Sequence, residues 1–240
     1  MLSKIEEQYT KYNEIFNDLD NLFLDTNKTA RVLLENSLYL SVFTVFEGFL
    51  KELIDNYIET ISGKDVKFTQ LSEGIACLYF LECEKNIERI FNQSGEPQID
   101  AFRHYFGRMK ASIPSKELKK YIRFEFLHES KLNGYYKDLF DQIIGERNFL
   151  TELKIEQSQE FETFFKMEIE WDAYTFLREF TKKVRNNIAH QNQEFKIDGF
   201  SSFESITNTF LFIIRELINR YEKYNEVKLT EFSENIMAQF

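Results

Sequence analysis

Apolar residues recur at steps of three and four along most of this 240-residue chain, which is the spacing of an amphipathic helix and not of a strand. Between residues 2 and 24 the positions at this spacing are Leu2, Ile5, Tyr9, Tyr12, Phe16, Leu19 and Phe23. A longer pattern runs from Thr29 to about Ile61, with Leu34, Leu38, Val42, Val45, Phe46, Phe49, Leu53 and Tyr57 on one side. Neither stretch contains proline. The pattern predicts two long helices.

Two more helical patterns occupy the C-terminal part, from Trp171 to His190 and from about Ser201 to Tyr224. In the middle, SGKDVKF at 62–68 and NQSGEP at 92–97 are clear breaks, and shorter helices fit residues 69–91, 98–110, 115–129 and 135–144. Residues 146–172 are acidic and ambiguous between loop and helix, and we expect a solvated face there. The chain is therefore expected to form one domain over 1–240. Its core helices lie at about 2–61 and 171–224, and a helical insertion occupies about 62–170.

The composition strengthens the helical prediction. Only eight glycines and two prolines are present, so the turns that sandwiches, barrels and doubly wound sheets require are scarce. With 26 Phe and 12 Tyr, the chain has ample material for one packed core. We expect an all-α protein.

Other features bear on location and redox state. No apolar run approaches the roughly 20 residues that span a bilayer, and the first residues, MLSKIEEQY, are charged, so we expect no membrane association and a cytoplasmic protein. Cys77 and Cys83 lie six apart without a CxxC motif, and we expect both to be reduced thiols in the core.

The net charge is −10, from 30 basic and 40 acidic residues. Such a chain repels phosphate at long range, so any nucleic-acid contact must rest on a local basic patch. Residues 103–123 are one such patch, with aromatic residues interleaved, although solvated helices and core aromatics explain the same pattern.

Few residues can act as an acid or base near neutral pH, because the only histidines are His104, His128 and His190. HExxH, the EF-hand loop and Gly-x-Ser-x-Gly are all missing, and no two histidines have metal-ligand spacing. We therefore expect neither a metal nor a cofactor.

The segment KKVRNNIAHQN, residues 182–192, places Asn186 directly after Arg185 and His190 five residues after that arginine. This RNxxxH pattern, late in a helical chain, resembles the signature of the HEPN superfamily of helical ribonucleases, and VFEGFLKELI at 45–54 shares in the likeness. Arg123 and His128 have the same spacing without the asparagine. The resemblance implies a HEPN-like bundle and a metal-independent endoribonuclease of a toxin or antiphage system. It also implies catalytic roles for Arg185, Asn186 and His190 in a site that two protomers share.

Helix geometry supports this segment independently. At roughly 100° per residue, Ala173, Leu177, Phe180, Val184 and Ile188 fall within about 80° of arc and are expected to face the core. Arg178, Lys182, Arg185, Asn186 and His190 then point outward. Asn186 and His190 can touch at i, i+4, whereas Arg185 lies about 140° from His190 at that pitch. Arg185 can converge on Asn186 and His190 either through its own long stem or through a two-fold mate, and the second possibility favours a homodimer.

Residues around the motif suggest supporting roles. Lys182, Lys183 and Arg178 are predicted to contact RNA phosphates, since they lie on or beside the motif. Glu47, at the border of the apolar arc of the second helix, is a candidate to orient Arg185, with a solvated carboxylate as the alternative.

Three functions are compatible with the pattern. The leading one is RNA cleavage by attack of the 2′-hydroxyl, with His190 as acid or base and Arg185 binding phosphate, in a protein that has RNA as substrate and an antitoxin or regulatory protein as partner. The second is a non-catalytic HEPN-like binding or regulatory subunit, which the absence of a glycine after His190 leaves open. The third is a plain helical scaffold in which RNNIAH has no role.

Overall fold

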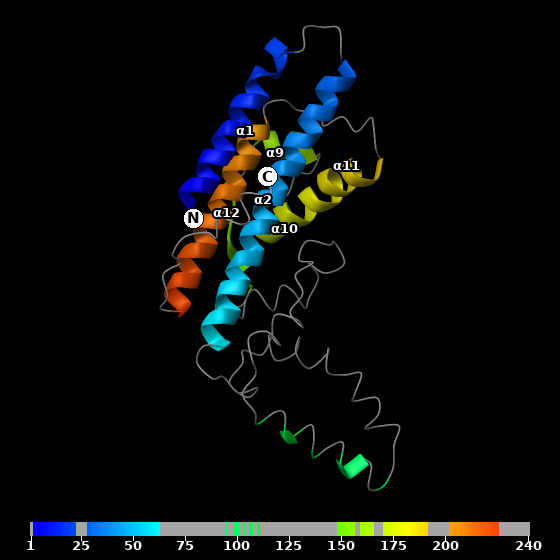
Figure 1. Ribbon diagram of the computed structural model, residues 1–240. Helices are drawn as coiled ribbons and strands as arrows, with labels where there is room; N and C mark the ends of the chain where they lie inside the picture. Colours follow the sequence, from blue (N-terminus) through cyan, green and yellow to red (C-terminus); the bar gives the residue numbers. More distant parts are fainter. Residues whose placement is uncertain are drawn as a thin grey trace.

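A computed structural model describes residues 2–22, 28–62, 95, 98–100, 103, 106–107, 110, 148–156, 159–165, 170–191 and 202–225. The elements with bounds are α1 (Leu2–Leu22), α2 (Lys28–Ser62), α8 (Phe149–Glu152), α9 (Gln159–Phe165), α10 (Ala173–Phe180), η3 (Thr181–Arg185), α11 (Asn186–Gln191) and α12 (Ser202–Asn225) (Figure 1). Within the described residues there is no strand, only one isolated bridge between Lys154 and Asp172. The prediction of an all-α protein is confirmed.

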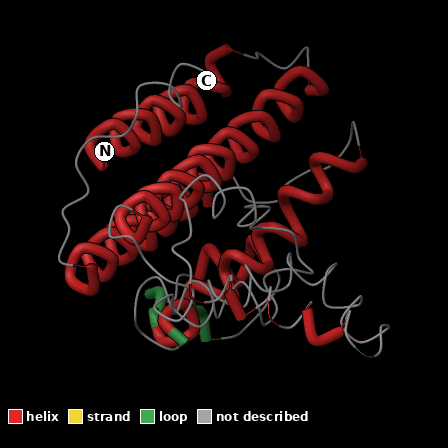
Figure 2. Tube along the Cα trace, turned by 60° about the horizontal axis from the view of Figure 1, so that its bottom comes forward, coloured by secondary structure: helices red, strands yellow, loops and turns green. Residues whose placement is uncertain are grey.

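Three long helices, α1, α2 and α12, run alongside one another (Figures 1 and 2). Arg215 donates to Glu6 at 2.6 Å and Asn13 donates to Thr207 at 3.0 Å, so residue numbers fall along α12 as they rise along α1, and these helices are antiparallel. The Tyr9 hydroxyl donates to the Val42 carbonyl at 2.9 Å and joins α1 to α2. The three longest predicted helices are thus confirmed to within about two residues at each end.

The fourth predicted helix crosses α2 near its middle (Figure 1). It comprises α10, η3 and α11 without interruption, and we call residues 173–191 the motif helix. Its first turn is capped by Asp172, whose side chain accepts a hydrogen bond from the Thr175 amide at 2.7 Å. The helix therefore begins at Ala173, two residues after the predicted start at Trp171.

Aromatic side chains fill the space between α2, α12 and the motif helix. Phe180 stacks on Phe43 with ring centroids 5.7 Å apart, and Phe210 of α12 lies 5.1 Å from Phe180. Phe176 approaches Phe210 to 5.2 Å. Each fully buried phenylalanine contributes about 1.5–3 kcal/mol of transfer free energy, so this cluster fixes the motif helix on α2 and α12.

The described part of residues 146–172 has the expected solvated face, since Glu152, Glu156 and Glu170 are exposed, but it also has a buried face that was not expected. Its apolar side chains enter the core, namely Phe149, Leu150, Ile155, Phe161, Phe165 and Trp171. Backbone hydrogen bonds from Ile155 to Trp171 and from Ala173 to Leu153, both 2.9 Å, tie the segment to the start of the motif helix. The acidic residues dominate the composition, but they alternate with apolar residues in elements too short to show a period.

Several expectations concern residues outside the described part. These are the helices at 69–91, 115–129 and 135–144, together with Cys77, Cys83, His104 and His128. Of the helix expected at 98–110, the described positions 98–100, 103, 106–107 and 110 are helical. Of the basic patch at 103–123, the described cations Arg103 and Lys110 are exposed, and Arg103 pairs with Asp100 at 3.2 Å.

Among the described helices, one stretch is apolar and long enough to cross a membrane by length and composition alone, namely Lys28–Tyr57 of α2. Half of its apolar window is buried inside the domain. Core helices of soluble proteins meet the same criterion, and α2 packs against α1, α12 and the motif helix in that manner.

Candidate active site

The motif helix contains a π-helical turn, η3, that ends at Arg185. A π-turn closes from i to i+5 instead of i+4, so the uniform 100° per residue of the sequence projection does not hold across it. The predicted core face is nevertheless confirmed, because Ala173, Leu177, Phe180 and Val184 are buried and Ile188 packs against the core. Phe176, Glu179 and Thr181 are buried as well, so the buried face is wider than predicted.

Arg185 and Asn186 are joined side by side at the end of this turn. The Arg185 Nη1 donates a hydrogen bond to Asn186 Oδ1 at 3.1 Å, and both residues are half-buried. Arg185 therefore reaches Asn186 within one chain through its own stem. The hydrogen bond uses a neutral acceptor, so the positive charge of the guanidinium is not neutralised by it.

His190 lies one helical turn after Asn186, in α11. Its side chain is outside the described part of the structure. The i, i+4 relation of the two positions on one helix is present, as the sequence pattern requires.

Glu47 lies on α2, the helix that η3 contacts, and is half-buried. Burial raises the pKa of the Glu47 carboxyl above its ordinary value, and the positive charge of Arg185 lowers it in part. The guanidinium is thus within electrostatic reach of Glu47. This is the proximity that a supporting role for Glu47 needs, and the role itself stays a prediction.

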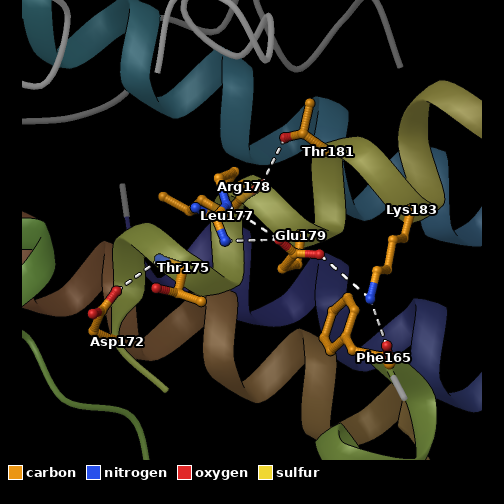
Figure 3. Close-up of polar contacts among 8 residues, drawn as sticks. All are labelled: Phe165, Asp172, Thr175, Leu177, Arg178, Glu179, Thr181 and Lys183. Atoms are coloured by element: carbon orange, nitrogen blue, oxygen red, sulfur yellow. Dashed lines mark hydrogen bonds and ion pairs between the residues drawn. The ribbon is translucent and has the colours of Figure 1, made fainter. Parts of the chain in front are cut away.

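A buried carboxylate that the sequence reasoning missed organises the other side of the motif helix. Glu179 has 5% of its surface exposed, and Figure 3 shows Arg178 and Lys183 on either side of it. Arg178 Nε and Nη2 donate to Glu179 Oε1 at 3.1 and 2.9 Å, and Lys183 Nζ lies 3.4 Å from Oε2. The ammonium also donates to the Phe165 carbonyl at 2.6 Å, which joins the motif helix to α9.

The signal for this cluster was present in the sequence. Glu179 is the only carboxylate between Ala173 and Gln191, and it precedes Lys183 by four residues. The helical projection of this segment shows which cations face outward, but it does not show which of them the single acid neutralises.

The three predicted RNA contacts therefore differ in their surroundings. Lys182 is exposed, and Arg178 and Lys183 both pair with Glu179. An RNA phosphate would compete with a carboxylate at the last two positions. Whether any of the three binds RNA remains a prediction.

In the part of the chain that the structure describes, no three His, Cys, Asp or Glu side chains are grouped so that they could hold a metal ion.

Comparison with known families agrees with the fold and with the resemblance drawn from RNNIAH. The family model for HEPN_MAE_28990-like HEPN domains matches residues 1–227, which includes the middle segment that the motif likeness did not reach. Neither the curated proteins nor the solved structures contain a match to this chain. Because the match spans nearly all 240 residues, the chain belongs to the HEPN_MAE_28990-like family of HEPN domains.

Proposed function

We propose that this HEPN protein is a metal-independent endoribonuclease of a toxin or antiphage defence system, with Arg185, Asn186 and His190 as its catalytic residues. One observation carries the proposal. The Arg185 and Asn186 side chains are hydrogen-bonded at 3.1 Å on a half-exposed surface, and the same helix places His190 one turn further on. HEPN-type domains are often ribonucleases, which agrees with this grouping.

The chemistry requires no metal, because RNA contains its own nucleophile. The His190 imidazole removes the proton of the 2′-hydroxyl, whose oxygen forms a bond to the adjacent phosphorus while the bond from phosphorus to the 5′-oxygen breaks. The leaving 5′-oxygen takes up a proton, and the product is a 2′,3′-cyclic phosphate. The Arg185 guanidinium stabilises the negative charge that builds on the phosphate oxygens, and Asn186 holds the guanidinium in place.

We further propose that the site is completed in a homodimer, with the motif helices of two copies facing each other. Arg185 lies within electrostatic reach of Glu47 on α2, and a second copy would add its own Arg185 and His190 to the same phosphate. Sedimentation at micromolar concentration tests this part. A protein that is monomeric and still cleaves RNA would refute the shared site and leave the catalytic residues in place.

The deciding experiment incubates the full-length protein and its His190→Ala variant with mixed cellular RNA. We expect cleavage by the unmodified protein in the presence of EDTA, 2′,3′-cyclic phosphate ends, and no cut where 2′-deoxyribose replaces ribose at the site. Cleavage that EDTA abolishes, or that proceeds equally on the deoxy substrate, would contradict the mechanism.

A different result identifies the alternative. If the unmodified protein and His190→Ala are equally inert on every RNA, the protein is better explained as a non-catalytic binding or regulatory subunit of a larger complex.

A further inference from the structure

The side chains of Tyr174 and Arg178 lie against each other on the motif helix, where Tyr174 also packs against the edge of the core and the Arg178 side chain is 38% exposed. The Arg178 Cζ lies over the Tyr174 ring, 6.0 Å from its centroid. The two hydrogen bonds to Glu179 hold the edge of the same guanidinium, because Nε and Nη2 share Oε1. The guanidinium is thus restrained on two sides, by an aromatic ring and by a buried carboxylate, before any ligand arrives.

This pair continues into the proposed active site. Tyr174, Arg178, Lys182 and Asn186 follow one another at four-residue steps, and none of the four is buried. Each of these residues is a surface neighbour of the next, because residues four apart on a helix are adjacent. Twelve residues at about 1.5 Å each cover roughly 18 Å, which matches a few nucleotides of an extended strand.

The charge of this helix suits a nucleic acid although the whole protein does not. Residues 173–191 contain four cations, Arg178, Lys182, Lys183 and Arg185, against the single acid Glu179, a local charge of +3 in a chain of −10. The one acid is buried, so the outward side of the helix presents cations only. A polyanion is therefore attracted to this helix although the net charge of the whole chain repels it.

We propose that the Tyr174–Arg178 pair is a stacking platform for a nucleobase of single-stranded RNA, placed next to the phosphate that Arg185 binds. Bases of single strands stack on aromatic rings and on guanidinium planes, whereas the bases of a duplex are already stacked on each other. Since Glu179 occupies the edge of the guanidinium, Arg178 offers its plane and not its charge. The platform rests on the proposed ribonuclease function and specifies its substrate as unpaired RNA.

Binding to the full-length His190→Ala protein tests the platform without cleavage. The probes are a fluorescein-labelled single-stranded RNA octamer, the same octamer annealed to its complement, and octamers with one abasic position each. Tyr174→Leu removes the ring and keeps apolar bulk, and we expect the single strand to bind it about 10-fold more weakly. Tyr174→Phe should bind as the parent does. Arg178→Lys keeps the charge, loses the plane and should be weakened as well.

Two comparisons isolate stacking from general damage. Tyr12→Leu is the matched control, because Tyr12 is also a half-buried tyrosine but lies on α1 and not on the motif helix. This substitution should leave RNA affinity unchanged. The abasic octamer that is weakened most with the parent should show no further loss with Tyr174→Leu. Fluorescence of the single tryptophan, the buried Trp171, reports whether each variant keeps its core.

Each outcome separates this inference from the ribonuclease proposal. Equal affinity of Tyr174→Leu and the parent, or equal affinity for single strand and duplex, would overturn the platform while cleavage by the unmodified protein still stood. Absence of RNA binding by every variant, together with absence of cleavage, would overturn both.

Discussion

The motif helix has two cationic regions, one around Glu179 and one at Arg185. They differ in whether a buried carboxylate neutralises the cation. Arg178 and Lys183 stabilise the Glu179 carboxylate, which burial has removed from its hydration shell. Four residues beyond Thr181, Arg185 donates to the neutral Asn186 amide and, of the acids in the described part of the chain, Glu47 acts on it electrostatically. A cation paired with a buried carboxylate supports the fold, while one held by an amide keeps its charge for a ligand.

The largest expected effect is at Arg185. Arg185→Ala should lower RNA cleavage by about 10²-fold or more, because it removes the charge that stabilises the phosphate in the transition state. Arg185→Lys should restore little, since an ammonium cannot make the two-pronged contact of a guanidinium. Initial rates on one RNA substrate measure both variants. Full activity of Arg185→Ala would remove the distinction between the two regions.

Lys183→Met should affect stability first. It removes a 2.6 Å charged hydrogen bond to the Phe165 carbonyl and an ion pair with buried Glu179, and should lower the free energy of unfolding by about 2 kcal/mol. Urea unfolding followed by circular dichroism measures the change. Lys182→Met is the matched control, because Lys182 is adjacent to Lys183 in the chain and is exposed. It should change the free energy of unfolding by less than about 0.5 kcal/mol. Equal losses at the two lysines would contradict the assignment of Lys183 to the fold.

Lys182→Gln should have the converse effect on RNA. Loss of one phosphate contact should weaken binding several-fold and reduce the slope of log affinity against log salt by about 0.7, the value for one charge on a single strand. Fluorescence anisotropy in the His190→Ala background at several salt concentrations gives the slope. A slope that Lys182→Gln leaves unchanged would exclude Lys182 from the RNA contacts.

The smallest effect is expected at Glu47 and depends on pH. Burial raises the pKa of this carboxyl in the folded protein, so the folded state holds its proton more tightly than the unfolded chain does. Stability from this group is present below the ordinary pKa of 4.5 and is lost as the pH rises through the raised value. Glu47→Gln should lack that loss and should be at least as stable as the parent at pH 7, by thermal unfolding.

The activity of the same variant separates the two explanations of Glu47. If Glu47 positions Arg185, Glu47→Gln should cleave RNA more slowly while remaining stable. Unchanged cleavage would make Glu47 a boundary residue without a part in the site.

Local pattern was sufficient for the long helices and for the side of the motif helix that is buried. Val184 and Ile188 follow Leu177 and Phe180 at helical spacing, and each packs where the projection put it. The RNNIAH segment was also evident from spacing alone, and the family match over residues 1–227 agrees with the likeness it suggested. Periodicity can predict these features because residues three and four apart share a helix face wherever that helix packs.

Tertiary structure decided what periodicity could not. The sequence determined four long helices, their apolar sides and an Arg-Asn pair one turn before a histidine. Only packing showed that Phe149, Phe161 and Trp171, which belong to an acidic segment, are buried in the core. Only packing showed that Glu179 is buried between two cations. Only packing brought Glu47 of α2 within reach of Arg185. Burial of a short element, the solvation of a charge and the distance between two helices all depend on residues far apart in the chain, and no local repeat records them.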